Sequence, residues 1–290
     1  MSFNVIRMGN YKISENLRCI DYRVSGKEFS LVPVEDGSVL KTHPQPSQEE
    51  LPKFYESEDY ISHTDSKQSF HDRLYHWVKK GMLKRKLKWI KEFQNKGSIL
   101  DVGAGTGDFL WEAKKEGWEV YGVEPSIKAR ERASIKGITL YPKLDFEEAR
   151  QFDVITLWHV LEHVPDFKSE ISQLKKLLKP GGILVIAVPN FLSYDAVKYG
   201  KYWAGYDVPR HLWHFSRAGI IKEVTSQELV FQKERPLVFD SFYVSLLSEK
   251  YKNGKSRLFP AVINGLLPNL RARRTGEYSS LTYFFRKELK

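Results

Sequence analysis

A glycine-rich turn between two regular elements carries the clearest chemical signal in this sequence. The apolar run Ile99–Val102 ends at three alternating glycines, Gly103, Gly105 and Gly107, and a helix-compatible run begins at Asp108. Glycine permits backbone conformations and close approaches that a Cβ atom would block. A strand, a glycine turn and a helix in this order bring backbone N–H groups close to a nucleotide-like ligand. Taken alone, the pattern also fits a plain tight turn.

An acidic residue follows the turn at a distance that suits such a ligand. Val120–Val123 has the composition of a second short strand, and Glu124 ends it about 20 residues after the glycines. A carboxylate there can accept hydrogen bonds from both hydroxyl groups of a ribose. The alternative is a solvated carboxylate at a strand end, and the glycine turn upstream favours the ribose.

Several segments, taken in order, resemble the class I S-adenosylmethionine-dependent methyltransferases. The resemblance is closest to the ubiquinone-biosynthesis branch, whose members act on many small molecules. It covers about half of the chain, roughly from Ser98 to Glu234. The matching segments are Asp101–Gly107, Val123–Pro125, Phe152–Ile155, His159–His163, Leu178–Gly182 and Val188–Asn190.

The resemblance implies a binding site for S-adenosylmethionine (SAM), which becomes S-adenosylhomocysteine once its methyl group is transferred. The glycine turn would pass under the methionine and ribose, with Asp101 near the methionine amino group and Glu124 on the ribose hydroxyls. Leu144 or Asp145 is expected at the adenine edge. The implied cofactor contacts are Asp101, Gly103, Ala104, Gly105, Gly107, Glu124, Pro125, Leu144, Trp158 and His159.

The end of the fourth expected strand carries a group of possible metal ligands. Ligand sites in open α/β sheets lie at the carboxyl ends of strands, which places Trp158 and His159 near the methionine end of the cofactor. His159, Glu162 and His163 stand at i, i+3 and i+4, so a helical turn would put them on one face. Such a face can hold a divalent ion, and some ubiquinone-type relatives are reported to use a metal near this position. Because the wider family carries this turn without a metal, we favour a structural role and expect no metal.

The long connection Pro189–Phe215 is expected to bind the methyl acceptor. A loop of this length inside a compact domain is usually functional, and its aromatic side chains could form a largely apolar pocket. His211 could act as a general base, because imidazole titrates near neutral pH, and Arg210 could bind an anionic group of the substrate. The alternative is that both residues only pin the loop. The expected pocket residues are Tyr202, Trp203, Tyr206, Trp213 and Tyr243, and the catalytic candidates are His211, Arg210 and His159.

These residues predict a methyltransferase that acts on a small molecule. Methyl transfer needs the acceptor atom held in line with the methyl group, and a hydroxyl acceptor also needs a base. The methylated atom, oxygen, nitrogen or carbon, stays open. Two other functions also stay open: an RNA- or protein-directed methyltransferase, and a SAM-binding protein without turnover. A nucleic-acid partner is disfavoured because the sequence contains no recognisable RNA-binding module.

The surrounding elements predict an α/β fold. Apolar strands alternate with helices over about 98–188, which indicates a parallel sheet covered on both faces. We expect a Rossmann-like, doubly wound sheet of seven mostly parallel strands with helices on both faces, its short third strand near 138–141. The resemblance makes the last strand, Ser279–Arg286, antiparallel and inserts it between the fifth and sixth. A helical insertion at about 240–270 would cap the active-site side or mediate dimerisation.

The N-terminal region differs from the rest of the chain. Residues 1–66 form a polar, β-rich extension, residues 67–97 a helical linker and residues 98–290 the methyltransferase domain. In related methyltransferases a zinc ribbon often precedes a segment like Pro44–Leu51. Only Cys19 remains where paired cysteines would lie, and one thiol cannot build a four-ligand zinc site. We therefore expect a metal-free relic of the ribbon.

Composition places the chain among ordinary globular proteins. It has 290 residues, 41% of them hydrophobic and 28% charged. No apolar run has the length of a membrane span, the N-terminus lacks a secretory signal, and one cysteine excludes an internal disulfide. The cytoplasm is the expected location, with a monomer or homodimer as the expected assembly. The net charge of +10 could attract nucleic acids or anionic lipids, but for the lysines of Lys79–Lys96 we favour the solvated face of an amphipathic helix.

Overall fold

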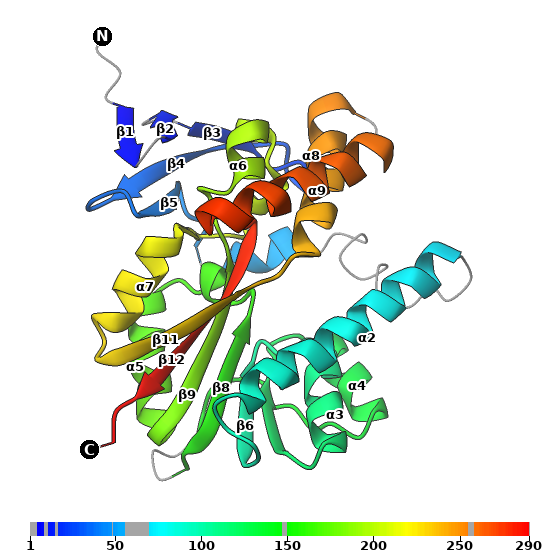
Figure 1. Ribbon diagram of the computed structural model, residues 1–290, viewed down its shortest axis with the longest axis vertical. Coiled ribbons are helices and arrows are strands. Elements are labelled where there is room, and N and C mark those ends of the chain that lie inside the picture. Colours follow the sequence, from blue (N-terminus) through cyan, green and yellow to red (C-terminus); the bar gives the residue numbers. More distant parts are fainter. Residues whose placement is uncertain are drawn as a thin grey trace.

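A six-stranded sheet forms the centre of the molecule. The computed structural model describes residues 5–8, 11–14, 17–47, 49–55, 70–146, 150–254 and 258–289. The central strands are β6 (Ser98–Val102), β7 (Glu119–Val123), β8 (Phe152–Trp158), β9 (Leu178–Pro189), β11 (Leu229–Pro236) and β12 (Ser280–Lys287). Their order across the sheet is β11-β12-β9-β8-β6-β7 (Figure 1).

The strand directions confirm the expected fold class. β7, β6, β8 and β9 run parallel, and β12 runs antiparallel to both β9 and β11. The last strand therefore lies between the fifth and sixth, as predicted. The strand expected near 138–141 is reduced to one parallel bridge between Tyr141 and Val123. Pro142 follows directly and has no N–H to continue a ladder, so the seventh strand position holds only this bridge among the described residues.

Helices cover both faces of the sheet. Ile99 packs in one core cluster with α2, α3 and α4, whereas its neighbour Leu100 packs in another with α5 and α7. Successive side chains of a strand point to opposite faces, so both faces are buried, as a doubly wound sheet requires. These helices are α2 (Phe70–Lys91), α3 (Asp108–Lys115), α4 (Ile127–Ile135), α5 (Phe167–Leu177) and α7 (Arg217–Thr225).

A second sheet joins the N-terminal region to the long connection Pro189–Phe215, which we call the acceptor loop after its expected role. β5 (Val39–His43) pairs with β10 (Trp213–Phe215), a strand of the long connection that sequence analysis did not foresee. The order of this sheet is β10-β5-β4-β3, with β4 at Glu28–Val34 and β3 at Leu17–Ile20. The remaining N-terminal elements are the hairpin β1 (Val5–Met8) and β2 (Tyr11–Ser14) and the 3-10 turn η1 (Leu51–Tyr55).

Three helices form a cap above the carboxyl ends of the central strands. They are α6 (Tyr194–Tyr199), α8 (Asp240–Asn253) and α9 (Leu258–Thr275), and they lie beside the N-terminal sheet (Figure 1). The short turn η2 (Leu161–His163) lies between β8 and α5, and η3 (Gly200–Tyr202) and η4 (Ala204–Tyr206) lie between α6 and β10. In the described residues, no helix is both long enough and apolar enough to cross a membrane.

Candidate cofactor and acceptor site

The three glycines of the turn share a positive φ but differ in what surrounds them. All three adopt positive φ, at 68° for Gly103, 54° for Gly105 and 72° for Gly107. A Cβ on Gly103 would lie 2.5 Å from the Val160 side chain, and one on Gly107 would lie 3.1 Å from Ala133. At Gly105, in contrast, no described heavy atom lies within 4 Å of the Cβ position. The turn is therefore closely packed at both ends and faces open space at its middle.

Glu124 is held at this open space by backbone N–H groups. Its Oε2 accepts a hydrogen bond from Gly105 N at 2.8 Å, and its Oε1 accepts one from Ser126 N at 2.9 Å. A carboxylate can accept about four hydrogen bonds, so acceptor positions remain for two ligand hydroxyls. The predicted ribose-binding carboxylate is thus fixed in orientation beside the glycine turn.

A buried acid and a lysine lie at the end of the neighbouring strands. Asp101 is 2% exposed and accepts a hydrogen bond from Thr156 Oγ1 at 2.6 Å. Burial raises the pKa of Asp101 to about 7, while Thr156 and Lys86 oppose the rise. The Lys86 ammonium lies 4.0 Å from the centre of the Trp158 ring. Sequence analysis missed Lys86 because it lies within a lysine-rich helix that fits a solvated face.

The other expected cofactor contacts follow the same edge of the sheet. Ala104 N donates to Val123 O at 2.9 Å, which ties the glycine turn to the end of β7. The carbonyl of Pro125 accepts a hydrogen bond from Arg130 at 2.7 Å. Leu144 is partly buried against the core on the α5 side. The structure therefore places these residues around the ends of β6 and β7.

His159 is clamped between two carboxylates. Its Nδ1 lies 3.3 Å from Glu162 Oε1, and its Nε2 lies 3.0 Å from Asp240 Oδ2, at the start of α8. Burial alone would lower the pKa of His159, but both carboxylates raise it to about 9. An imidazole that holds its proton at neutral pH is unsuited to act as a base, which disfavours that role for His159.

Three side chains with metal-ligating atoms converge at η2. One ligand atom from each of Glu162, His163 and His211 lies within 4.8 Å of the others. The imidazole Nδ1 atoms face backbone carbonyls, His163 that of Arg210 at 2.9 Å and His211 that of Gly205 at 3.0 Å. Such contacts favour the tautomer in which Nδ1–H donates to the carbonyl, which leaves the lone pair of Nε2 for a metal. Glu162 Oε2 is buried and has no hydrogen-bond partner among the described residues. The set fits a divalent ion.

This group differs from the one expected from sequence. The sequence groups His159 with Glu162 and His163, and His159 does contact Glu162, but its other nitrogen faces Asp240. His211 from the acceptor loop takes its place in the group of converging ligand atoms. Backbone contacts also show part of the structural role, because Leu212 N donates to Glu162 O at 2.8 Å. Burial lowers the pKa of His211 to about 4, so its imidazole is neutral at pH 7 and can ligate a metal, while the same shift weakens it as a base.

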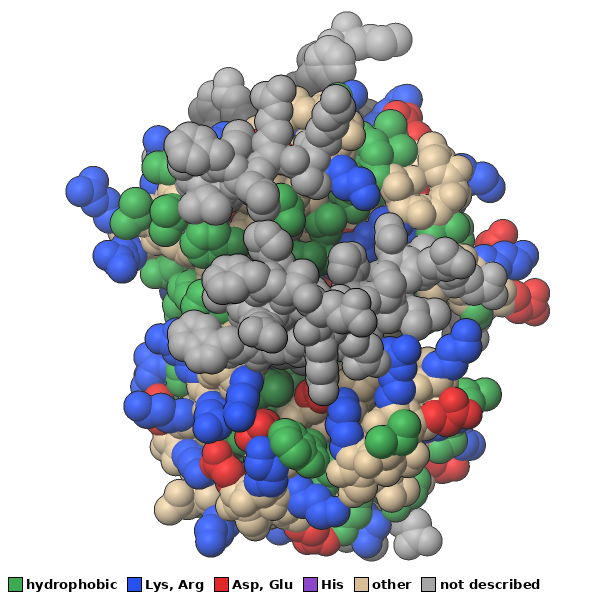
Figure 2. Space-filling view, turned by 90° about the vertical axis from the view of Figure 1, so that its right-hand side faces the viewer, with side chains coloured by type: hydrophobic (Ala, Val, Ile, Leu, Met, Phe, Trp, Pro, Cys, Tyr) green, Lys and Arg blue, Asp and Glu red, His purple; other side chains and the backbone are tan. Residues whose placement is uncertain are grey.

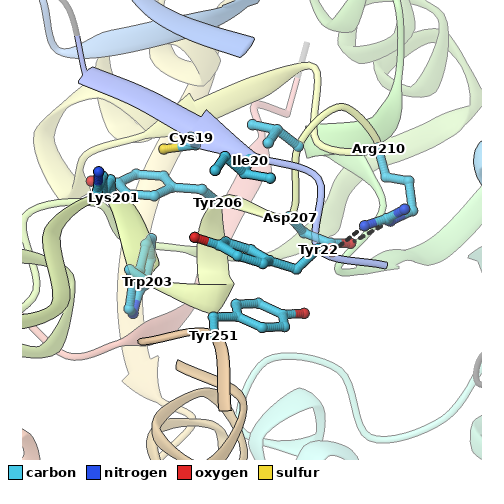
Figure 3. Close-up of a pocket in the computed structure, with 10 residues that line it drawn as sticks. Cys19, Ile20, Tyr22, Lys201, Trp203, Tyr206, Asp207, Arg210 and Tyr251 are labelled. Carbon is cyan, nitrogen blue, oxygen red and sulfur yellow. Dashed lines mark hydrogen bonds and ion pairs between the residues drawn. The ribbon is translucent and has the colours of Figure 1, made fainter. Parts of the chain in front are cut away.

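The contacts of Arg210 indicate that it fastens the loop to its surroundings and does not bind a substrate. Its side chain is 3% exposed, and all three guanidinium nitrogens bond within the protein. Two of them hold Asp207, one of these also reaches Asp21 at 3.3 Å, and the third donates to Phe54 O at 3.1 Å. Figure 3 shows Arg210 bonded to Asp207 beside Tyr22 and Tyr251. The geometry supports the alternative in which Arg210 pins the loop.

The aromatic residues expected to form one pocket lie in different surroundings. Trp203 and Tyr206 are 2% and 4% exposed and pack edge to face at 4.9 Å. Trp213 Nε1 donates to Val164 O at 2.9 Å, while Tyr243 is 49% exposed on α8. Tyr202 lies in η3 next to Tyr22. Two small hollows flank Trp203, one toward His211 and His214 and the other toward Cys19, Tyr22 and Tyr251 (Figure 3).

The N-terminal sheet holds the acceptor loop in place. Thr42 Oγ1 donates to His211 O at 2.6 Å and lies 2.9 Å from His214 Nε2. Gln45 Nε2 donates to Leu212 O at 3.0 Å. Together with the pairing of β5 and β10, these contacts make the N-terminal sheet part of the support of His211. The single cysteine, Cys19, is buried, and its pKa is raised to about 12, chiefly by that burial.

Comparison with known proteins agrees with this geometry. The family model described as a methyltransferase domain matches residues 74–229, more than half of the chain. A ubiquinone biosynthesis O-methyltransferase of Actinobacillus pleuropneumoniae is 39% identical over 106 residues, covering 32% of this chain and 45% of the relative. The homologous enzyme of Erwinia tasmaniensis is 36% identical over 118 residues, covering 36% and 49%. The chain thus spans about half the length of the curated relatives it matches.

A solved structure supports the fold. Coclaurine N-methyltransferase bound to N-methylheliamine and S-adenosylhomocysteine has a TM-score of 0.52 and 14% identity to this chain. The match covers 78% of this chain and 76% of that one. From the family match, the strand order and the glycine turn bonded to Glu124, the chain belongs to the class I S-adenosylmethionine-dependent methyltransferases.

Proposed function

We propose that this protein transfers a methyl group from SAM to a hydroxyl group of a small molecule. The observation that carries the cofactor part is the Glu124 carboxylate, held by Gly105 N beside open space at the glycine turn. Two features support a hydroxyl acceptor. His211 lies with Glu162 and His163 in a cluster of proton-accepting groups, and the matched relatives are O-methyltransferases.

Charge at the methionine end supports the same assignment. The methionine part of SAM carries an ammonium and a carboxylate. In this proposal the buried Asp101 meets the ammonium, and Lys86, beside Trp158, meets the carboxylate. The remaining requirement is alignment, since methyl transfer depends on holding the acceptor in line with the sulfonium. The acceptor loop, supported by Thr42 and Arg210, would hold the acceptor in that alignment.

The proposal is tested with two measurements on the purified protein. Calorimetric titration with SAM should show one site per chain. Incubation with SAM and a panel of small phenols, alcohols and amines should release S-adenosylhomocysteine with at least one phenol or alcohol. Amine methylation alone would overturn the hydroxyl assignment, and absence of heat with SAM would overturn the cofactor site.

Replacing Lys86 by methionine should weaken binding of S-adenosylhomocysteine by about 10-fold, the range of one charge-assisted hydrogen bond. Affinity for 5′-methylthioadenosine, which lacks the methionine carboxylate, should stay unchanged. Lys84→Met is the matched control, because Lys84 is exposed on the same helix. Equal losses for both ligands would contradict the assigned role. Calorimetry with the two ligands measures it.

A metal-assisted form of the same reaction is the second candidate. It is favoured by the unpartnered, buried oxygen of Glu162 and by the two imidazoles that converge with this carboxylate. Glu162, His163 and His211 would hold the ion. A bound divalent cation would lower the pKa of an acceptor hydroxyl at this position.

Cobalt tests that candidate without relying on activity. Dialysed protein should bind one Co²⁺ ion per chain, with visible absorption bands that show nitrogen and oxygen ligands. Glu162→Gln and His211→Gln should each lower the affinity for Co²⁺ about 10-fold or more. His43→Gln, at an exposed histidine outside the cluster, should leave it unchanged. Absence of bands in the unsubstituted protein would leave only the structural role for the cluster.

A further inference from the structure

Helix α9 buries small residues and exposes leucines. Gly265 packs so closely on α8 that a Cβ there would lie 2.5 Å from the Phe242 ring, and Ala272 is 1% exposed. Leu266 and Leu270, one turn apart, are 48% and 53% exposed. A surface helix of a globular protein normally turns its leucines toward the core. The outer face of α9 therefore has an arrangement that the packing of the cap does not explain.

The neighbouring helix α6 extends this face. The Arg271 guanidinium lies 4.1 Å from the centre of the Tyr194 ring, which joins α9 to α6. Val197 on α6 is 47% exposed. We call the combined surface the cap patch. Its members are Val197, Lys198, Leu266, Leu270, Arg271, Arg273 and Arg274.

The cap patch is basic, with no compensating acid on its own helices. Arg271, Arg273 and Arg274 are exposed, and within the described part of the chain none of them has an ion pair with an acidic side chain. The sequence of α9 contains no Asp or Glu. The acid of α6, Asp195, is fully buried and accepts hydrogen bonds from Trp203 and Ser279.

Acids on the adjoining elements are also turned inward or occupied. Glu249 on α8 is 7% exposed and accepts a hydrogen bond from Tyr199 at 3.0 Å. Glu277, after α9, accepts one from Asn190 at 2.7 Å. Hydrophobic and basic side chains are mixed along the upper left of Figure 2, a view of the side that carries the cap. The exposed charged side chains on the described parts of α6 and α9 are therefore all basic.

We propose that the cap patch docks the protein onto an anionic phospholipid surface. Exposed leucines flanked by arginines suit the boundary between headgroups and acyl chains, because the leucines insert while the guanidinium groups remain at the phosphates. Basic residues close to an anionic bilayer each add to the attraction. A nucleic acid would use the arginines and leave the leucines in water. A symmetric dimer through the patch would bring arginine against arginine.

Vesicle sedimentation tests the docking with the full chain. The protein should pellet with vesicles of equal parts phosphatidylglycerol and phosphatidylcholine in 0.1 M salt, and should remain in solution with phosphatidylcholine alone. Leu266→Gln combined with Leu270→Gln should weaken binding about 10-fold. Arg271→Gln, Arg273→Gln and Arg274→Gln together should weaken it about 5-fold per arginine removed.

Matched variants on other surfaces control for general charge and hydrophobicity. Ile127→Gln with Ile135→Gln removes two exposed apolar side chains from α4, and Lys80→Gln, Lys84→Gln and Lys88→Gln remove three exposed charges from α2. Both should bind vesicles as the unsubstituted protein does, and thermal unfolding should show that all variants fold. Equal losses in these controls, no binding to anionic vesicles, or a dimer abolished by the leucine substitutions would overturn the proposal. The test uses no SAM, so its outcome is separate from that of the proposed function.

Discussion

Replacing Gly105 by alanine should lower the affinity for SAM by at least about 100-fold, or about 2.7 kcal/mol, while the protein still folds. No described atom occupies the position of the new methyl group, so the substitution meets nothing in the unliganded protein. The methyl group would enter the open space beside the Glu124 carboxylate, where we place the cofactor. The positive φ of 54° adds strain of about 1–2 kcal/mol. Calorimetric titration with SAM measures the affinity, and thermal unfolding measures the strain.

Gly137→Ala provides a control with the same strain. Gly137 also has a positive φ, of 72°, and also faces open space, but at the end of α4 rather than in the turn. Both variants should unfold at similarly lowered temperatures, and only Gly105→Ala should lose SAM binding. If Gly105→Ala bound SAM as tightly as Gly137→Ala does, the cofactor could not lie against the middle of the turn.

The fold followed from local patterns where neighbouring residues decide the structure. Serine before a helical run predicts an N-cap, and the Ser216 hydroxyl accepts a hydrogen bond from Gly219 N at 3.0 Å at the start of α7. Ser47 and Glu50 have the spacing of a capping box, and Ser47 N donates to Glu50 Oε2 at 3.0 Å. In contrast, the pairing of β5 with β10 joins segments far apart in the chain. No hydrophobic period within either segment specifies such a partner, so the second sheet was not foreseen.

In the candidate site, too, contacts within a short segment could be predicted, whereas contacts between distant segments could not. The cofactor side depends on one strand, one turn and the next strand, and the residues expected there lie around the ends of β6 and β7. Lys86 comes from the helix before the first strand and Asp240 from a helix near the end of the chain. His211 reaches Glu162 only because the N-terminal sheet holds its loop. Residues brought together by long-range packing leave no spacing in the sequence, which is why these partners were missed.

Replacing Arg210 by methionine should destabilise the protein by about 3–5 kcal/mol, the usual cost of removing one partner from a buried ion pair. Asp21 and Asp207 are 0% and 14% exposed in their side chains, and Asp21 would lose its cation in a buried site. Arg23 would still face Asp207, at 3.3 Å. The N-terminal sheet and the acceptor loop should loosen together, because Arg210 also donates to Phe54 O. Urea unfolding monitored by tryptophan fluorescence measures the loss.

Arg18→Met is the matched control, since Arg18 pairs with Glu28 on the surface, at 65% and 51% exposure. Exposed pairs contribute at most about 1 kcal/mol, so this variant should unfold nearly as the unsubstituted protein does. If the Arg210 variant lost no more than this control, the buried cluster would not be what joins the sheet to the loop.

The pH dependence of the stability lost in Arg210→Met distinguishes the contribution of the ion pairs from that of packing. Although burial acts to raise it, Arg210 and Arg23 hold the pKa of Asp207 well below its usual range. A carboxyl group whose pKa is depressed by folding stabilises the protein above its unfolded pKa, near 3.9, and this stabilisation disappears as pH falls toward the folded value. In Arg210→Met the pKa of Asp207 should rise, so less stabilisation remains to be lost on acidification. The stability difference between the two proteins should therefore narrow from pH 7 to pH 3. A difference that stayed constant over this range would assign the effect of Arg210 to its packing alone.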